Sequence, residues 1–363
     1  MRVKPLLAKI RAMKIEVSGT ALDMGLAQGE ATAGSWATML KTMGNAAIPR
    51  GFEDMIAKYC PRQLVRMIGI ARGAEVPLEL VLLGSVGELL LAQFDYFIGA
   101  CTAIAWMDKG SPKPAPIIGK NFDYPSAFSA VNIVRISRPQ DAYASIDVTA
   151  GPSSGAHGGV NEKGLAIAYN SGCSIDKPKM LLPIGMLVQE ALERFETAEE
   201  AINFITDSPR GGSALMMIAD RAGDMAGLEV TPHYWGVRRP EKDRIGHTNH
   251  SQTPQTVAFD LPSNAYYSDK MPPLLRGHRI KESSELRYNR LEKLMAQAPI
   301  LDIASAKTIL ADHGEGDMPS DNTICRHGPY YATTMSVVLY TGEPKLSVAW
   351  GNPCRNSFEE VAL

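Results

Sequence analysis

The sequence predicts a layered α+β protein rather than a parallel βαβ fold. Three observations support this class: a helical N-terminal block, a switch to β-compatible runs at Cys101, and grouped blocks of helices and strands after that point. Runs of strands separated by runs of helices are typical of sheets covered by helices. At 363 residues, the length fits two domains of ordinary size or one large domain.

The composition is that of an ordinary globular protein. Hydrophobic residues make up 45% of the chain and charged residues 21%, which excludes wholesale disorder. Lysine and arginine number 37 against 39 acidic residues, so the net charge of −2 provides no basic excess for binding nucleic acid. No apolar run reaches the length of about 18 residues that a membrane span needs. The basic N-terminus lacks a signal-peptide core, so we expect a cytoplasmic protein.

The first hundred residues are predicted to be mostly helical. The segment 63–75 mixes apolar and polar residues, and the segment 78–91 is almost continuously apolar, as in a buried helix. Small residues interrupt this pattern just before Cys101. We therefore expect a helical region over 1–100 and a second region over 101–363.

The region after this boundary opens with strand-like sequence. The run 101–106 is apolar and β-compatible, and the segment 108–114 has the composition of a turn. A second strand begins at Ile117 and is expected to end near Gly119, so that the two strands form a hairpin. Further strands are expected at 130–137, 143–148 and 165–169.

Two helices and then further alternating elements follow. Apolar residues recur on one helical face over 184–195. Thr197 and Glu200 are spaced as a capping box, which starts a second helix through Ile205. Later elements expected from similar patterns are strands at 214–219, 225–230, 333–340 and 345–350 and helices at 284–296 and 305–310.

Two short patterns typical of serine hydrolases occur in unfavourable surroundings. Ser153 lies in a Gly-x-Ser-x-Gly pattern, but 157–164 is interpreted as loop where a nucleophile elbow needs a helix. Ser174 and Lys177 match Ser-x-x-Lys, yet a proline follows the lysine and would disrupt the helix that aligns them. A serine hydrolase using Ser153 stays open as an alternative function. So does an uncleaved, non-catalytic protein of the same fold that binds a small molecule.

No segment has the spacing of a standard metal site. The five cysteines are Cys60, Cys101, Cys173, Cys325 and Cys354. They are odd in number and far apart, which indicates neither a zinc ribbon nor a disulfide framework. The polar run from Asp312 to Asp317 includes His313 but matches no zinc or calcium loop, so it is interpreted as the end of a helix. We therefore expect no metal and no organic cofactor.

Cys101 stands out because it lies where the helical block gives way to sheet, after two small residues. Cleavage of the Ala100–Cys101 bond would create a free α-amine on the residue that carries the thiol. An α-amine has a pKa of about 7.7–8.0, so it can accept the thiol proton and later protonate a leaving amine. Small preceding residues would let the thiol reach its own upstream carbonyl. Cys101 is therefore a candidate N-terminal nucleophile.

Six stretches, taken in order, resemble the N-terminal-nucleophile linear amide hydrolases. This family includes bile salt hydrolases, penicillin V acylases, acid ceramidases and isopenicillin N acyltransferase. The first three stretches are CTAIA from Cys101, GKNFDY from Gly119 and NEKGL from Asn161. The other three are TNH at 248–250, DH at 312–313 with ICRH at 324–327, and GNPC at 351–354. These three resemble most the isopenicillin N acyltransferase branch, the acyl-CoA:6-aminopenicillanic acid acyltransferases.

The resemblance implies a four-layer αββα sandwich of two antiparallel sheets covered by helices. It also implies self-cleavage between Ala100 and Cys101, with 1–100 retained as a small subunit and 101–363 forming the αββα domain. The implied activity is that of a cysteine amidohydrolase or acyltransferase, which cleaves a linear amide or thioester through an acyl-enzyme on Cys101.

The resemblance further implies roles for individual residues. Asp123 matches the aspartate that holds and orients the amine of the nucleophile, and Asn249 matches the oxyanion-hole asparagine. Arg287 matches an arginine that can lower the pKa of the thiol, with Arg290 as the competing candidate. Asn170 matches a position that lines the substrate carbonyl.

Two positions depart from the relatives. Lys120 stands where bile salt hydrolases carry arginine, so it is a candidate substrate contact although bile-salt-type contacts are not expected. Ala100 replaces the glycine that precedes the nucleophile in isopenicillin N acyltransferase, and cleavage is still expected.

His157, His250 and His327 are expected to make structural hydrogen bonds rather than to act in catalysis. The expected partner is a small N-acyl amide or acyl thioester, without nucleic acid or membrane, and a homo-oligomer is left open.

Overall fold

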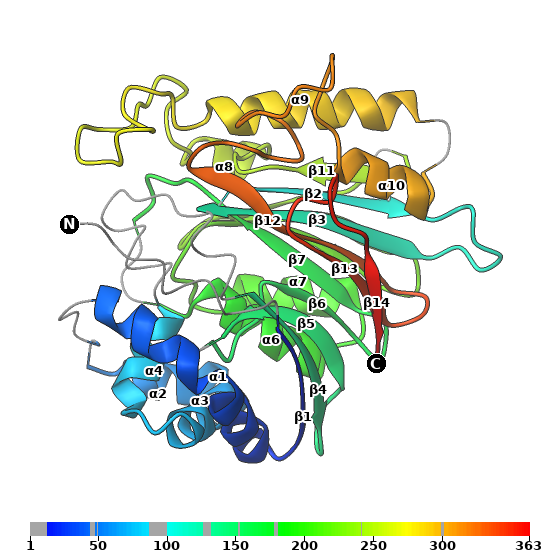
Figure 1. Ribbon diagram of the computed structural model, residues 1–363. Helices are drawn as coiled ribbons and strands as arrows, with labels where there is room; N and C mark the ends of the chain where they lie inside the picture. The colour runs from blue at the N-terminus through cyan, green and yellow to red at the C-terminus, as the bar shows by residue number, and fades with distance from the viewer. Residues whose placement is uncertain are drawn as a thin grey trace.

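Two stacked β-sheets form the centre of the protein, and helices cover the outer face of each (Figure 1). This computed structural model describes residues 13–43, 48, 50–86, 100–125, 132–151, 153–177, 181–240, 242–298 and 301–363. Within those residues the layers follow the order helix, sheet, sheet, helix. The predicted α+β class and the four-layer arrangement are therefore confirmed.

The larger sheet has eight strands in the order β1-β4-β5-β6-β7-β8-β9-β10. They are β1 (Met13–Gly19), β4 (Asn132–Pro139), β5 (Ser145–Ala150), β6 (Gly158–Asn161), β7 (Ala166–Ser171), β8 (Ala214–Ala219), β9 (Met225–Val230) and β10 (Trp235–Arg238). Neighbouring strands are antiparallel except β1 and β4, which run parallel. The purely antiparallel prediction is wrong at this edge, because the long connection through the N-terminal helices and a hairpin of the smaller sheet lets the two strands run the same way.

The smaller sheet has six strands in the order β11-β2-β3-β12-β13-β14. They are β11 (Arg244–His247), β2 (Ala100–Met107), β3 (Pro116–Pro125), β12 (Tyr331–Tyr340), β13 (Lys345–Trp350) and β14 (Glu359–Ala362). The predicted hairpin of β2 and β3 is confirmed, but β3 does not end near Gly119. It continues to Pro125. The apolar pattern did not predict this continuation, because Lys120, Asn121 and Asp123 are polar although they are buried in the sheet.

The helices cover the two outer faces of the sheets. They are α1 (Ala21–Met43), α2 (Phe52–Tyr59), α3 (Pro61–Gly73), α4 (Leu78–Ser85), α6 (Ile184–Arg194), α7 (Ala198–Asp207), α8 (Pro254–Val257), α9 (Glu282–Gln297) and α10 (Ile303–Leu310). Helices α6 and α7 cover the larger sheet with α1 to α4 beside them, and α9 and α10 cover the smaller sheet (Figure 1). The capping box of Thr197 and Glu200 is present at the start of α7.

Three apolar clusters correspond to the three contacts between layers. The cluster between the sheets takes alternate residues of the strands, among them Ala103, Phe122 and Val148. A second cluster joins the larger sheet to its helices, and a third joins the smaller sheet to α9 and α10. The central strands are therefore buried on both faces, which explains why sequences such as 214–219 are apolar without alternation.

Several strands have too weak a sequence signal to be predicted. The interpretation of 157–164 as loop is wrong, because β6 lies within it. Its two glycines have low β propensity, but a Cβ on Gly159 would lie 2.6 Å from the main-chain oxygen of Ile146 in β5. The strand therefore needs glycine for close approach to its neighbour. Strands β1, β10, β11 and β14 and the short helix α8 were likewise not predicted.

The segment before Cys101 is built into the sandwich. Strand β1 pairs with β4, so the region predicted to be mostly helical also contributes a strand to the larger sheet. From α1, the side chain of Gln28 donates hydrogen bonds to the main-chain oxygens of Gly151 and Ser153. From α3, Arg66 forms a buried ion pair with Glu193 of α6 at 3.1 Å. These contacts join residues on either side of Cys101 without using the peptide bond between Ala100 and Cys101.

Helices α1 and α3 approach so closely that glycine is required at the contact. A Cβ placed on Gly25 of α1 would lie 2.1 Å from the main-chain oxygen of Arg66. We expect Gly25→Ala to destabilise the protein by about 2–3 kcal/mol in denaturant titrations, because the helices must separate. Gly34→Ala in the same helix is the matched control, since nothing lies within 4 Å of its Cβ. There the gain in helix propensity should raise stability by up to about 1 kcal/mol, and equal effects of both changes would contradict the close packing.

Glu190 in α6 makes the stability of this helical layer depend on pH. Burial, reinforced by the charge of Glu193, raises the pKa of Glu190 to about 7. The folded protein therefore holds a proton that the unfolded chain releases near pH 4.5, so stability falls as the pH rises from about 4.5 to 7. This rise in the pKa corresponds to a loss of about 3 kcal/mol in the free energy of unfolding above pH 7.

We therefore expect Glu190→Gln to raise the denaturation midpoint at pH 8 and to flatten its pH dependence between pH 5 and 7. Glu343→Gln is a suitable control, because the Glu343 side chain is 84% exposed. An unchanged pH profile in Glu190→Gln would show that another group is responsible.

Candidate active site

Cys101 lies at the start of β2, an inner strand of the smaller sheet, and is 1% exposed. Side chains alternate along a strand, so its thiol points to the same side as Ala103 and Ala105, which belong to the core between the sheets. The side chains on the other face of β2, Ile104 and Trp106, pack in the cluster that contains α9. The thiol and the groups around the Cys101 main chain therefore occupy different sides of the same strand.

Arg287 of α9 binds the main chain of Cys101 from the helical side. Its Nη1 donates to the Cys101 carbonyl oxygen at 2.6 Å and to the Thr102 hydroxyl at 2.9 Å. Its Nη2 donates to Oδ1 of Asn249 at 2.9 Å. The same Oδ1 accepts the Cys101 N–H at 2.9 Å. Arg287 and Asn249 thus hold both polar groups of the Cys101 main chain.

Asp123 of β3 lies opposite Ala100 in the register of the hairpin. Its carboxylate is fully buried, and Oδ1 accepts a hydrogen bond from Thr333 at 2.7 Å. Its Oδ2 has no hydrogen-bond partner among the residues that the structure describes, and the Nη1 of Arg287 lies 4.0 Å away. Burial raises the pKa of Asp123, although the charges of Arg287 and Arg326 oppose this effect. A buried acceptor next to the predicted cleavage position is therefore left unused.

Asn249 is held in the loop after β11. Its main-chain N–H donates to the Ser284 hydroxyl at 2.8 Å, and its Nδ2 donates to the Ser171 carbonyl at 2.9 Å. The Nδ2 of Asn249, the predicted oxyanion-hole donor, is therefore bound to Ser171, and the oxygen of its amide accepts the Cys101 N–H. Stabilising an oxyanion would require Nδ2 to change partner.

Asn170 supports this loop from β7. Its Nδ2 donates to the main-chain oxygens of His247 and Thr248 at 3.3 and 2.8 Å. Its buried Oδ1 has no hydrogen-bond partner within the described part of the chain. Asn170 thus contacts the residues leading to Asn249.

Lys120 lies on the thiol side of β3. Its ammonium donates to the main-chain oxygens of Tyr169 and, at 3.4 Å, His157. It also lies 3.9 Å from the centre of the Phe122 ring. This cation is buried but already solvated by protein groups, so it is a fixed positive charge near Cys101.

The environment of the thiol has opposing effects on its acidity. Burial raises the pKa of Cys101, and the charge of Asp123 acts in the same direction. The positive charges of Lys120 and Arg287 and a hydrogen bond from the Asp123 main chain oppose this rise. The net effect raises the pKa of the Cys101 thiol above its usual value, so the thiol is protonated at neutral pH.

Arg290, the competing arginine, does not reach this site. Both ends of its guanidinium bind the carboxylate of Asp312, at 2.9 and 2.7 Å. Of the two arginines, the structure brings only Arg287 to Cys101. The other acidic residues of the 312–317 run also have partners, since Glu315 pairs with Lys293 and Asp317 with His313.

Arg326 was not singled out from the sequence but lies next to these residues. It is buried and binds Asp321 through two hydrogen bonds of 3.0 and 2.9 Å. Its main-chain N–H donates to Thr333, the residue that binds Asp123. Its position within the stretch ICRH was the available sequence signal. A small pocket beside this group is lined by Ala100, Cys173, Asn249, Tyr267, Ile280, Lys281, Ser283, Ser284, Arg287, Arg326 and Tyr331.

The two serine patterns do not form hydrolase sites. Ser153 accepts a hydrogen bond from the Gly155 N–H in a turn, and strand β6 follows where a nucleophile elbow needs a helix. Ser174 donates to the Phe259 carbonyl, and residues 174–177 are not helical. The structure therefore contradicts a nucleophile elbow at Ser153 and a helical Ser-x-x-Lys site at Ser174.

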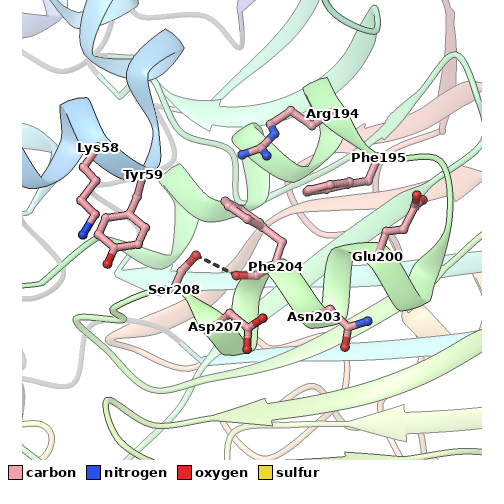
Figure 2. Close-up of a pocket in the computed structure, with 9 residues that line it drawn as sticks. All are labelled: Lys58, Tyr59, Arg194, Phe195, Glu200, Asn203, Phe204, Asp207 and Ser208. Carbon is pink, nitrogen blue, oxygen red and sulfur yellow. Dashed lines mark hydrogen bonds between the residues drawn. The ribbon is translucent and has the colours of Figure 1, made fainter.

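A separate hollow lies between α2 and the pair α6 and α7 (Figure 2). It contains Arg194 stacked 5.0 Å from the ring centres of Phe195 and Phe204. The residues that line it are Lys58, Tyr59, Arg194, Phe195, Glu200, Asn203, Phe204, Asp207 and Ser208. None of the site residues predicted from the sequence is among them.

A family model described as acyl-coenzyme A:6-aminopenicillanic acid acyl-transferase matches residues 107–354. The match covers more than half of the chain and includes Asp123, Asn170, Asn249 and Arg287, but it begins after Cys101. No curated protein gives a significant match. Among the helices that the structure describes, none combines the length and apolarity needed to cross a bilayer.

Three solved structures are similar at low sequence identity. An N-acylethanolamine-hydrolyzing acid amidase ortholog from Caenorhabditis elegans is 13% identical over 67% of this chain and 94% of its own, with a TM-score of 0.44. A variant of the conjugated bile acid hydrolase from Clostridium perfringens is 14% identical over 72% and 97%, with a TM-score of 0.44. Penicillin V acylase from Agrobacterium tumefaciens is 14% identical over 72% and 86%, with a TM-score of 0.42.

Proposed function

Since the chain belongs to the acyl-coenzyme A:6-aminopenicillanic acid acyl-transferase family, we propose that it is a self-processing cysteine amidohydrolase or acyltransferase. Cys101 becomes the nucleophile when the Ala100–Cys101 bond is cut. The substrate is a linear N-acyl amide or an acyl thioester. No organic cofactor takes part in this reaction.

The observation that carries the proposal is the unused oxygen of Asp123. Its Oδ2 is buried and has no hydrogen-bond partner among the described residues, whereas buried polar groups nearly always have one. Asp123 lies opposite Ala100 in the hairpin, one residue from the nitrogen that cleavage would free. A new α-amine on Cys101 supplies the donors that this oxygen lacks.

Self-cleavage begins with attack of the Cys101 sulfur on the Ala100 carbonyl carbon. The bond between that carbon and the Cys101 nitrogen breaks, and the nitrogen leaves as an amine carrying the thiol proton. Water then hydrolyses the thioester, which gives an Ala100 carboxylate and restores the thiol. Asn249 and Arg287 support this step because they fix the nitrogen and the carbonyl of Cys101.

The processed enzyme uses the new amine as its base and acid. The α-amine of Cys101 takes the thiol proton, the sulfur attacks the substrate carbonyl, and the leaving amine receives that proton. Water or a second amine then releases the acyl group from sulfur. Asp123 orients the amine, and Lys120 and Arg287 favour the thiolate through their charges.

Asn249 stabilises the oxyanion after its side chain has rearranged. In the uncleaved chain its Nδ2 is bound to Ser171. Cleavage frees the Cys101 nitrogen from the peptide plane. The side-chain amide of Asn249 can then exchange hydrogen-bond partners and direct its Nδ2 at the reacting carbonyl. Asn170 acts as a positioning residue for this loop, and Lys120 is the candidate for substrate contact on the thiol side.

Hydrolysis is the reaction we put first. Acyl transfer requires a site that binds the acceptor and keeps water away from the acyl-enzyme. Transfer to an amine, as the family description indicates, is the second candidate. Release of free acid from an N-acyl amide, compared with acylation of 6-aminopenicillanic acid by an acyl thioester, distinguishes the two.

Denaturing mass spectrometry with N-terminal sequencing tests the proposal directly. Cleavage gives two fragments of 100 and 363 − 100 = 263 residues, the larger beginning at Cys101. On a native sizing column they should elute together, because β1 and α3 bind the region after Cys101. An intact chain in freshly folded protein would overturn the proposal and favour a non-catalytic binding protein.

A further inference from the structure

Two histidines and two cysteines form a cluster near the end of α10, apart from the residues assigned to catalysis. The imidazole nitrogens and sulfurs offered by His313, Cys325, His327 and Cys354 all lie within 4.8 Å of one another. We propose that this cluster is a structural zinc site. The proposal is independent of the function proposed above.

The four residues come from three separate parts of the chain. His313 follows α10, Cys325 and His327 precede β12, and Cys354 follows β13. Because the residues are brought together by folding, they lack the local spacing of a zinc finger or ribbon. For this reason the sequence indicated no metal site. The clustering of these four side chains in the structure is the reason to revise that expectation.

The distances between the side chains suit tetrahedral coordination. Nε2 of His327 lies 3.3 Å from the sulfur of Cys325 and 3.3 Å from the sulfur of Cys354. Around zinc, bond lengths of about 2.3 Å to sulfur and 2.0–2.1 Å to nitrogen put neighbouring ligand atoms about 3.3–3.8 Å apart. The two sulfur–nitrogen distances already lie in this range, and the ligand atoms farthest apart, at up to 4.8 Å, must approach by about 1 Å to hold the ion.

His313 provides an independent observation that points to a ligand. Its side chain is 9% exposed, and its buried Nε2 has no hydrogen-bond partner among the described residues. Its other nitrogen, Nδ1, lies 2.7 Å from the carboxylate of Asp317. A carboxylate on one nitrogen of a histidine and a metal on the other is a common arrangement at zinc sites.

The ligand set favours zinc over harder cations. Two thiolates and two neutral imidazoles balance the charge of Zn²⁺, and tetrahedral sulfur–nitrogen sites are typical of this metal. Four protein ligands leave no position for substrate or water, which indicates a structural rather than a catalytic ion. Cys354 is exposed and provides the side from which the ion can enter.

Such an ion would fix the main chain around Arg326, which lies between two of the ligands. The Arg326 N–H donates to Thr333 at 2.8 Å, and Thr333 donates to Asp123 at 2.7 Å. Zinc would therefore join the loop after α10, the segment before β12 and the turn after β13, next to residues that support Asp123.

Zinc content per chain is the decisive measurement. Full-length protein purified from zinc-supplemented medium should contain about one zinc ion per chain by inductively coupled plasma mass spectrometry. Cys354→Ser and the double variant Cys325→Ser with Cys354→Ser should lose it, whereas Cys60→Ala, which changes a cysteine in the helical core, should retain it. Zinc that stays at wild-type level in the double variant would overturn the proposal.

Cobalt replacement of the wild-type chain avoids dependence on variants that fail to fold. Co²⁺ bound by two thiolates and two imidazoles should give strong visible bands and a sulfur-to-metal charge-transfer band, which Zn²⁺ abolishes on titration. Absence of both zinc and these bands would overturn the assignment. So would a mass lower by two hydrogens that peptide mapping places at Cys325 and Cys354, because that disulfide would consume the ligands.

Discussion

Cys101→Ala is expected to remain a single intact chain and to lose activity by roughly 10⁴–10⁶-fold, the effect of removing a catalytic nucleophile. The sulfur is needed twice in the proposed reaction, first to attack the Ala100 carbonyl and then to form the acyl-enzyme. Alanine adds no bulk to the core between the sheets, where the Cys101 side chain points. Denaturing mass spectrometry and release of amine from N-acyl amides measure the two losses separately.

Two further variants make this result specific. Cys101→Ser keeps a nucleophile of much lower acidity and should be processed slowly or incompletely. Ser153→Ala should be processed and active like the wild type, because the Ser153 hydroxyl accepts a turn hydrogen bond from the Gly155 N–H and lies in no hydrolase site. Normal cleavage in Cys101→Ala, or acyl-enzyme formation lost only in Ser153→Ala, would contradict the assigned nucleophile.

Elements with strong local patterns were predictable from the sequence. Helix α6 has one apolar face, and Thr197 and Glu200 satisfy each other at the start of α7. In contrast, β6 begins with two glycines, which allow close approach to the neighbouring strands, Gly158 to β7 and Gly159 to β5. The end of β3 was missed because Lys120, Asn121 and Asp123 are polar and buried, so this part of the strand has no apolar pattern.

The site shows the same division between local and long-range information. Resemblance to a family identified Cys101, Asp123, Asn249 and Arg287, which folding brings into one network. Sequence alone could not show which of Arg287 and Arg290 lies near Cys101. Both belong to α9, and they differ in burial, which only the folded structure shows. The zinc cluster could not be predicted because its ligands meet only after three distant loops have packed.

Asp123→Asn is expected to lower the turnover of the processed enzyme by about 10²–10⁴-fold while changing few atoms. The oxygen bound to Thr333 can stay in place, but an amide NH₂ would replace the unused Oδ2. That group is a donor, so it cannot accept a hydrogen bond from the α-amine of Cys101. The amine would then be poorly oriented to take the thiol proton, and amine release in a single turnover should slow.

Stability must be measured in the same variant, because Arg287 would lose a nearby buried counter-charge. Breaking a buried pair costs about 3–5 kcal/mol in other proteins, and the 4.0 Å separation here places Asp123→Asn at the low end of that range or below it. Asp302→Asn is the matched control, since asparagine caps α10 as well as aspartate does. If Asp123→Asn is folded, processed and as fast as this control, the carboxylate does not orient the amine, and another group must hold it.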